Sequence, residues 1–322
     1  MSLSGSQDFT ITRDELIKAS LQHISAIGDG VTPSATQLSE SALLLNMLIK
    51  HWQTDDIQLW IRKLGYVLPI SGINKTALGA EGGHATNSYN YTTTSAASLS
   101  GASTITVTST TGITDTYYIG VELSDGTMQW TTVSGAPAGQ VVTLAAALTG
   151  DVASGAAVYC YESKIKRPLR ILDAYRRLSS DDTDTSLTRL TQQEYNAQSN
   201  KFSEGVPNSY FYDEVLSLST TLHPGNGDFY FWPIFENGDE VIVIQYTKVF
   251  DDLDAASNNV EFPQTWFLPL MVGLAWLLAP KHGIPLKERQ MLFQEMTILK
   301  DAAKNYDQEL GSLFLTVNRD RY

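Results

Sequence analysis

A long segment without basic residues constrains the fold of this chain most. Residues 76–163 contain no Lys or Arg, six acidic residues and 27 Ser or Thr. Short stretches in it alternate polar and apolar residues, which is typical of half-buried strands, and Thr packs well on a pleated sheet. The predicted strands cover residues 104–108, 117–123, 128–133, 140–144 and 157–161. We therefore expect a small all-β barrel or sandwich here.

Both ends of the chain carry a helical pattern instead. Thr12 and Glu15 fit a capping box, and apolar residues recur at helical spacing through the first 65 residues. Further helices are expected over residues 262–278 and 286–306. The predicted fold class is α+β: a discontinuous α-helical bundle built from both chain ends, with an inserted small all-β barrel or sandwich module and a β-meander.

Shifts in composition predict the domain limits. Residues 1–65 form the first part of the helical core and 262–309 complete it, with 66–75 as a linker and 76–163 as the inserted β module. Residues 164–261 hold a basic linker, a short helix capped by Thr191 and Glu194, and the β-meander, and 310–322 form a C-terminal arm. The glycine-rich residues 79–83 predict a flexible hinge into the β module.

Charge and cysteine content exclude several classes of protein. The 322 residues carry a net charge of −13, which argues against a generic nucleic-acid binder because phosphate affinity depends on a surplus of Lys and Arg. The single cysteine, Cys160, permits neither an internal disulfide nor a Cys-based zinc site and is expected to be a small buried strand residue. The N-terminus lacks a signal-peptide pattern, so synthesis in a cytoplasm is expected. The longest apolar run, residues 266–280, is too short for a membrane span.

Catalytic motifs are not apparent. The histidines lie far apart and form no His-Glu-x-x-His pattern: His23, His51, His84, His223 and His282. The glycines of 79–83 are not followed by Lys-Ser or Lys-Thr, and the acidic residues at 181–184 lack the glycine of a calcium loop. We therefore expect no enzyme activity, cofactor or metal. A carboxylate-based hydrolase using Glu81, Asp115 or Asp125 stays as a minor alternative.

Basic residues return immediately after the β module. They include four arginines that are candidate contacts with a partner protein or a neighbouring subunit: Arg167, Arg170, Arg176 and Arg177. One interpretation is that these arginines pair with acidic groups of the same chain or of a neighbouring copy. The other is a partner-facing patch, since Arg is favoured at interfaces.

Aromatic residues of the meander and the C-terminal tail each allow two interpretations. The rings at 210–212 and 229–232 alternate along strands, which favours core packing over a stacking platform for sugars or bases. The apolar, β-prone tail at 312–322 is either an edge strand or an arm that adds to another subunit.

Several segments together resemble a known family. They read TRDELIKASLQHISAIGDG, QLSESALLLNMLIKHWQTDDIQLW, RPLRILDAYRR, DFYFWP and FPQTWFLPLMVGLAWLLAPKHGI. In overall pattern they are similar to the head-to-tail adaptors of short-tailed bacteriophages, also called DNA-packaging stabilisation or head completion proteins. The likeness covers residues 8–65 and 164–310, and the β module at 76–163 departs from the smaller, mostly helical members.

The resemblance implies a non-enzymatic virion protein at the head–tail interface. Its copies, in a dodecamer, would form a ring under the portal protein that extends the DNA channel, helps retain packaged DNA and provides the platform for tail attachment. Partners would be the portal, the tail nozzle or tube protein and tail fibres, and double-stranded DNA would pass without sequence-specific binding. By analogy with the docking of such adaptors, the candidate portal-docking arm comprises Phe314, Leu315, Val317, Arg319, Arg321 and Tyr322.

The main alternative is a virion surface-binding module. In this case the β domain recognises a host glycan or receptor, and the helices anchor it to the particle. The acidic, Thr-rich character of residues 76–163 permits this alternative.

Overall fold

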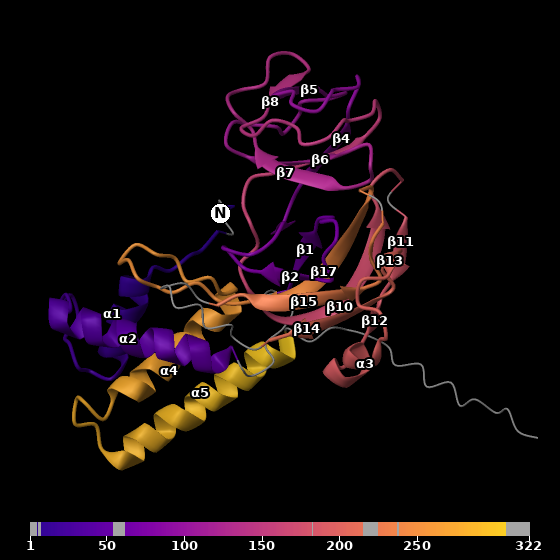
Figure 1. Cartoon of the computed structure of the whole chain (residues 1–322). Helices are drawn as coiled ribbons and strands as arrows, with labels where there is room; N and C mark the ends of the chain where they lie inside the picture. Colours follow the sequence, from indigo (N-terminus) through magenta and orange to yellow (C-terminus); the bar gives the residue numbers. More distant parts are fainter. Residues whose placement is uncertain are drawn as a thin grey trace, which may run out of the picture. The chain divides into compact units, whose positions relative to one another are not determined.

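The computed structural model of the chain describes residues 5, 8–53, 62–181, 183–214, 225–236 and 238–306. The chain divides into two compact units, one from residues 1–61 and 250–322 and the other from residues 62–249. The first unit is helical, and the second consists mainly of antiparallel sheets (Figure 1). The predicted mixed α+β class is therefore confirmed.

The helical unit draws its helices from both chain ends. Its elements are α1 (Arg13–His23), α2 (Ala35–Trp52), the 3-10 turn η1 (Gln264–Trp266), α4 (Phe267–Leu278) and α5 (Leu286–Tyr306). The predicted capping box at Thr12 is confirmed: its hydroxyl accepts from the backbone N–H of Glu15, whose carboxylate accepts from the backbone N–H of Thr12. Such caps satisfy amide groups that the first helical turn leaves unpaired.

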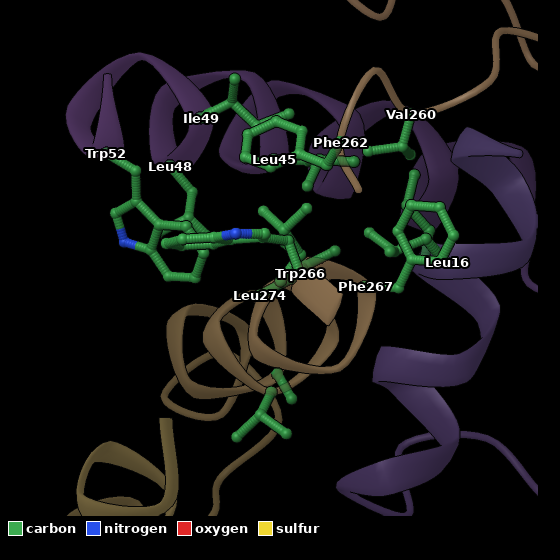
Figure 2. Close-up of a cluster of buried hydrophobic side chains, with 14 of the residues drawn as sticks. Leu16, Leu45, Leu48, Ile49, Trp52, Val260, Phe262, Trp266, Phe267 and Leu274 are labelled. Atoms are coloured by element: carbon green, nitrogen blue, oxygen red, sulfur yellow. The ribbon is translucent and has the colours of Figure 1, made fainter. Parts of the chain in front are cut away.

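Helix α4 lies against α1, α2 and α5 and forms the centre of this unit. The fully buried Trp266 ring meets the Trp52 ring edge to face, with centroids 5.9 Å apart (Figure 2). At Gly273 an added Cβ would lie 3.1 Å from Cδ2 of Leu48, so the small residue allows α2 and α4 to approach closely. The apolar run that is too short for a membrane span thus forms a buried helix.

Two sheets share one core in the second unit. The five-stranded sheet has the order β11 (Asp184–Ser186), β10 (Pro168–Leu178), β17 (Glu240–Lys248), β1 (Arg62–Val67) and β3 (Ala85–Thr86). The four-stranded sheet has the order β12 (Thr188–Arg189), β14 (Ser209–Asp213), β15 (Gly227–Trp232) and β2 (Lys75–Leu78). One buried cluster contains Ile242 and Ile244 of the first sheet and Phe229 and Phe231 of the second.

Smaller elements accompany these sheets. Strands β13 (Glu204–Gly205) and β16 (Ile234–Phe235) form a parallel pair, and the helix α3 (Gln192–Ala197) precedes them. The capping box that Thr191 and Glu194 predict for α3 is confirmed. In the four-stranded sheet Phe229 and Phe231 are buried and Tyr230 between them is not, so the predicted alternation of the rings is also confirmed.

Residues 90–161 form a further group of strands with its own buried cluster. Its four-stranded antiparallel sheet has the order β4 (Asn90–Thr93), β9 (Ala157–Tyr161), β6 (Tyr118–Glu122) and β7 (Met128–Thr132), and β5 (Thr104–Thr106) pairs with β8 (Val141–Thr143). The four-stranded sheet ends at β4 and β7, so these described strands form no closed barrel. Cys160 is buried on β9, as predicted, and burial raises the pKa of its thiol to about 11.

Three predicted boundaries differ from the structure. Residues 62–65, expected to be helical, belong to β1, because each of them pairs with a residue of β17. The expected linker at 66–75 includes the end of β1 and the buried residues Val67 and Leu68. The expected β module begins too early, since β2 and β3 within it pair with strands of the other two sheets.

The glycine-rich residues 79–83 form a packed turn rather than the expected flexible hinge. The backbone N–H of Gly82 donates to the Gly79 carbonyl, and that of Gly83 donates to the Ala77 carbonyl. A Cβ added at Gly82 would lie 2.2 Å from the Ala77 carbonyl oxygen. These glycines are therefore required by close backbone packing between β2 and β3.

Candidate functional site

The predicted C-terminal arm, residues 310–322, lies outside the part of the chain that the structure describes. Phe314, Leu315, Val317, Arg319, Arg321 and Tyr322 lie outside the described residues, as do residues 54–61, to which we extended the helical pattern. The portal-docking role of the arm therefore stays a prediction.

Two of the four candidate arginines pair with carboxylates of the same chain. Nη1 of Arg176 lies 2.9 Å from Oε1 of the buried Glu240, which is the first residue of the neighbouring strand β17. Burial raises the pKa of Glu240, and Arg176 opposes this shift. Nε and Nη2 of Arg177 both donate to the carboxylate of Asp184 at 2.8 Å, and these bonds lower the pKa of Asp184.

The other two arginines lie near the start of β10. Nη2 of Arg167 donates to the backbone carbonyl of Glu214, and Arg170 is exposed. The interpretation that these arginines pair with acidic groups of the same chain therefore holds for Arg176 and Arg177. A role of Arg167 and Arg170 in binding a partner stays a prediction.

The aromatic residues that face outward from the meander are covered by α3. The ring of Tyr195, which is buried, lies 6.2 Å from the Phe211 ring and 5.1 Å from the Tyr230 ring, and Nζ of Lys201 lies 4.6 Å from the centre of the Tyr195 ring. Because Tyr195 and Lys201 belong to the same chain, Phe211 and Tyr230 present no open stacking platform.

Two of the three carboxylates of the hydrolase alternative, Asp115 and Asp125, stabilise turns. Oδ1 of Asp115 accepts from the backbone N–H of Gly135, and Oδ1 of Asp125 accepts from the backbone N–H and the hydroxyl of Thr127. The hydrogen bonds from Thr127 lower the pKa of Asp125. Within the described part of the chain, no cluster of three or more His, Cys, Asp or Glu has a geometry that could hold a metal ion.

The helix α5 of the helical unit exposes apolar side chains. All 21 residues of this helix are described, and Met296 and Ala303 are the only buried residues among them. It exposes large apolar side chains, which we call the α5 surface: Leu286, Met291, Phe293, Ile298 and Tyr306. Ile298 is 69% exposed, although a soluble helix normally turns such residues toward its core.

A groove between α4 and α5 continues this surface. It encloses about 630 Å³ and is lined by Trp276 and Leu277 of α4, by Pro280, and by Leu286 and Phe293 of α5 among others. The Trp276 and Phe293 rings lie 5.2 Å apart. Other exposed apolar residues of the same unit include Leu43 and Met47 on α2 and Leu268 on α4.

The exposed residues lie on two sides of α5: Leu286 and Phe293 border the groove with α4, whereas Met291 and Ile298 lie about 140° away around the helix. Large apolar side chains exposed in this way are characteristic of protein–protein contacts. The α5 surface can bury apolar area against another protein. Sequence reasoning missed it, although a signal was present. The apolar positions 286, 291, 292, 293, 296, 298 and 299 cover more of the helix circumference than a single core-facing stripe requires.

The comparisons with known proteins add no assignment: the chain matches no family model and no curated protein sequence. None of the described helices combines the length and the hydropathy that crossing a membrane requires.

Proposed function

We propose that the protein is a non-enzymatic virion structural protein, a head-to-tail adaptor whose copies form a ring under the portal protein. In this proposal the ring extends the DNA channel, helps to retain packaged DNA and provides the platform for tail attachment. The observation that carries the proposal is α5, which exposes five large apolar residues and buries two of its 21 residues. A helix with so little intramolecular packing gains most of its burial from other subunits.

The arrangement of the chain supports the same proposal. The helices from both chain ends would form the discontinuous bundle that makes the subunit contacts, and residues 90–161 would form a β sandwich that projects from the ring. The net charge of −13 also fits, since acidic subunits around a channel repel DNA and let it slide.

Charged substitutions on α5 test the subunit contact. Phe293→Asp combined with Ile298→Asp places two carboxylates on the α5 surface, and we expect the assembly to dissociate to monomers with an unchanged circular dichroism spectrum. Leu99→Asp is the matched control, because Leu99 is 74% exposed but lies in the 90–161 segment. If the double variant assembles as the control does, α5 is not the subunit interface.

Removing the C-terminal arm tests the portal contact separately. Deletion of residues 311–322 is expected to abolish capture of the chain by immobilised portal protein while the α5 surface stays intact. Undiminished capture after this deletion would show that the arm does not dock the portal.

A further inference from the structure

One concave site of this acidic protein is lined by basic residues. It encloses about 670 Å³, and neither Asp nor Glu is among the residues that line it. The lining includes five cationic side chains: Arg62, Lys63, Lys164, Lys166 and Lys248. We call it the basic pocket.

Strand pairing brings these residues together from distant parts of the sequence. Arg62 and Lys63 of β1 pair with Thr247 and Tyr246 of β17, which places them beside Lys248, the last residue of that strand. On the other side of β17, Lys248 pairs with Pro168 of β10, so the segment that precedes β10 and carries Lys164 and Lys166 reaches the same end of the sheet. Three chain segments thus bring their positive charges to one end of the sheet.

Hydrogen bonds hold the framework of the pocket. Nδ2 of Asn87 donates to the Leu64 carbonyl and to the Tyr246 hydroxyl, both at 2.8 Å, and the Ser163 carbonyl accepts from the Thr86 hydroxyl. Nζ of Lys164 donates to the Gly82 carbonyl and lies 5.2 Å from the centre of the Tyr118 ring, so this lysine has a fixed position. The pocket is therefore a built feature of the sheet rather than a chance gathering of surface side chains.

The other cations have different environments. Lys63 and Lys166 are exposed, and Arg62 and Lys248 are half-buried. Arg62, Lys166 and Lys248 each have a further interaction in the structure. The side chains that remain most accessible to a ligand are thus those of Lys63 and Lys166.

We propose that the basic pocket binds two or more adjacent phosphate groups, in a linear polyphosphate or in a nucleic-acid backbone. Positive charges around a concave surface reinforce one another and attract anions even when the whole protein is acidic. Four of the five cations are lysines, which contact phosphate as point charges. The proposal is independent of ring formation, because every lining residue belongs to residues 62–249.

Binding to a labelled DNA duplex by the full chain tests the proposal, with inorganic triphosphate and polyglutamate as competitors. We expect the combined change Lys63→Glu and Lys166→Glu to weaken binding by about tenfold or more, since both lysines line the pocket. The control variant carries Lys18→Glu and Lys287→Glu on the helical unit, so its net charge changes by the same amount as that of the pocket variant. Its affinity for the duplex should stay within about twofold of that of the native chain. Circular dichroism verifies that both variants are folded.

The competitors distinguish the source of the phosphates. Displacement of the duplex by triphosphate, or loss of triphosphate binding in the pocket variant alone, supports a site for free polyphosphate. A site for the nucleic-acid backbone is supported if only the pocket variant loses duplex binding and triphosphate does not displace the duplex from the native chain. The proposal is overturned if neither ligand binds, if both variants weaken binding equally, or if polyglutamate displaces the duplex as well as triphosphate does.

Discussion

The imidazole of His84 stacks on the indole of Trp130, with ring centroids 3.9 Å apart and planes 12° from parallel. His84 immediately precedes β3, whereas Trp130 lies on β7 of the 90–161 segment. Nδ1 of His84 also shares a hydrogen bond of 2.7 Å with the hydroxyl of the buried Tyr161, and the Trp130 indole N–H donates to the Pro69 carbonyl. His84 therefore fastens the 90–161 segment to the shared sheets of its unit.

The first prediction is an acid-sensitive stability that depends on His84. Burial lowers the pKa of His84 to about 4 from its usual 6.5, and the charge of Lys164 adds to the effect. Between these pH values the unfolded chain binds a proton that the folded chain does not, so the free energy of unfolding falls as the pH drops through this range. The expected loss reaches about 3 kcal/mol near pH 4.

Urea unfolding at pH 7 and pH 4.5 measures this loss. His84→Gln keeps a side-chain hydrogen-bond acceptor but does not titrate, so this variant should lose about 2 kcal/mol less than the native chain between the two pH values. Equal losses in both proteins would show that His84 does not control the acid sensitivity.

The second prediction concerns the buried ion pair of Arg176 and Glu240. Arg176→Met leaves the carboxylate of Glu240 buried without its cation and should lower the free energy of unfolding by about 3 kcal/mol. Adding Glu240→Leu should recover most of the loss, because it removes the uncompensated charge. As a control, Arg177→Met breaks the more exposed pair with Asp184 and should cost less than about 1 kcal/mol. Equal losses for the two arginines would contradict this assignment.

The third prediction tests the packed turn at residues 79–83. Gly82→Ala forces a Cβ against the Ala77 carbonyl oxygen, and we expect destabilisation of about 2 kcal/mol in urea unfolding. At Gly28, whose nearest neighbour to an added Cβ is 3.7 Å away, the same substitution should change stability by less than about 0.5 kcal/mol. A flexible hinge would tolerate both changes equally well.

Sequence patterns predicted the elements whose signals are local. The capping boxes at Thr12 and Thr191, the helix at 286–306 and the alternation of the meander aromatics all depend on residues a few positions apart. Sequence patterns did not predict that β1 pairs with β17, because this contact joins residues about 180 positions apart. For the same reason the basic pocket was not visible in the sequence, where Lys63, Lys166 and Lys248 belong to separate segments.

The fourth prediction tests whether helices from the two chain ends form one core. Trp266 of η1 packs on Trp52 of α2, so Trp266→Ala should leave a cavity and lower the stability of the helical unit by about 3 to 5 kcal/mol. Hydrogen exchange should then accelerate in α1 and α2 as well as in α4. Acceleration confined to residues 262–278 would mean that the N-terminal helices are stable without the C-terminal ones.

Assembly with the portal protein tests the central claim most directly. If the adaptor proposal holds, purified chain mixed with the proposed portal partner should give closed rings seated on the portal in negative-stain microscopy. The variant that combines Phe293→Asp and Ile298→Asp should give none. A chain that neither forms rings nor associates with the portal would contradict the adaptor proposal.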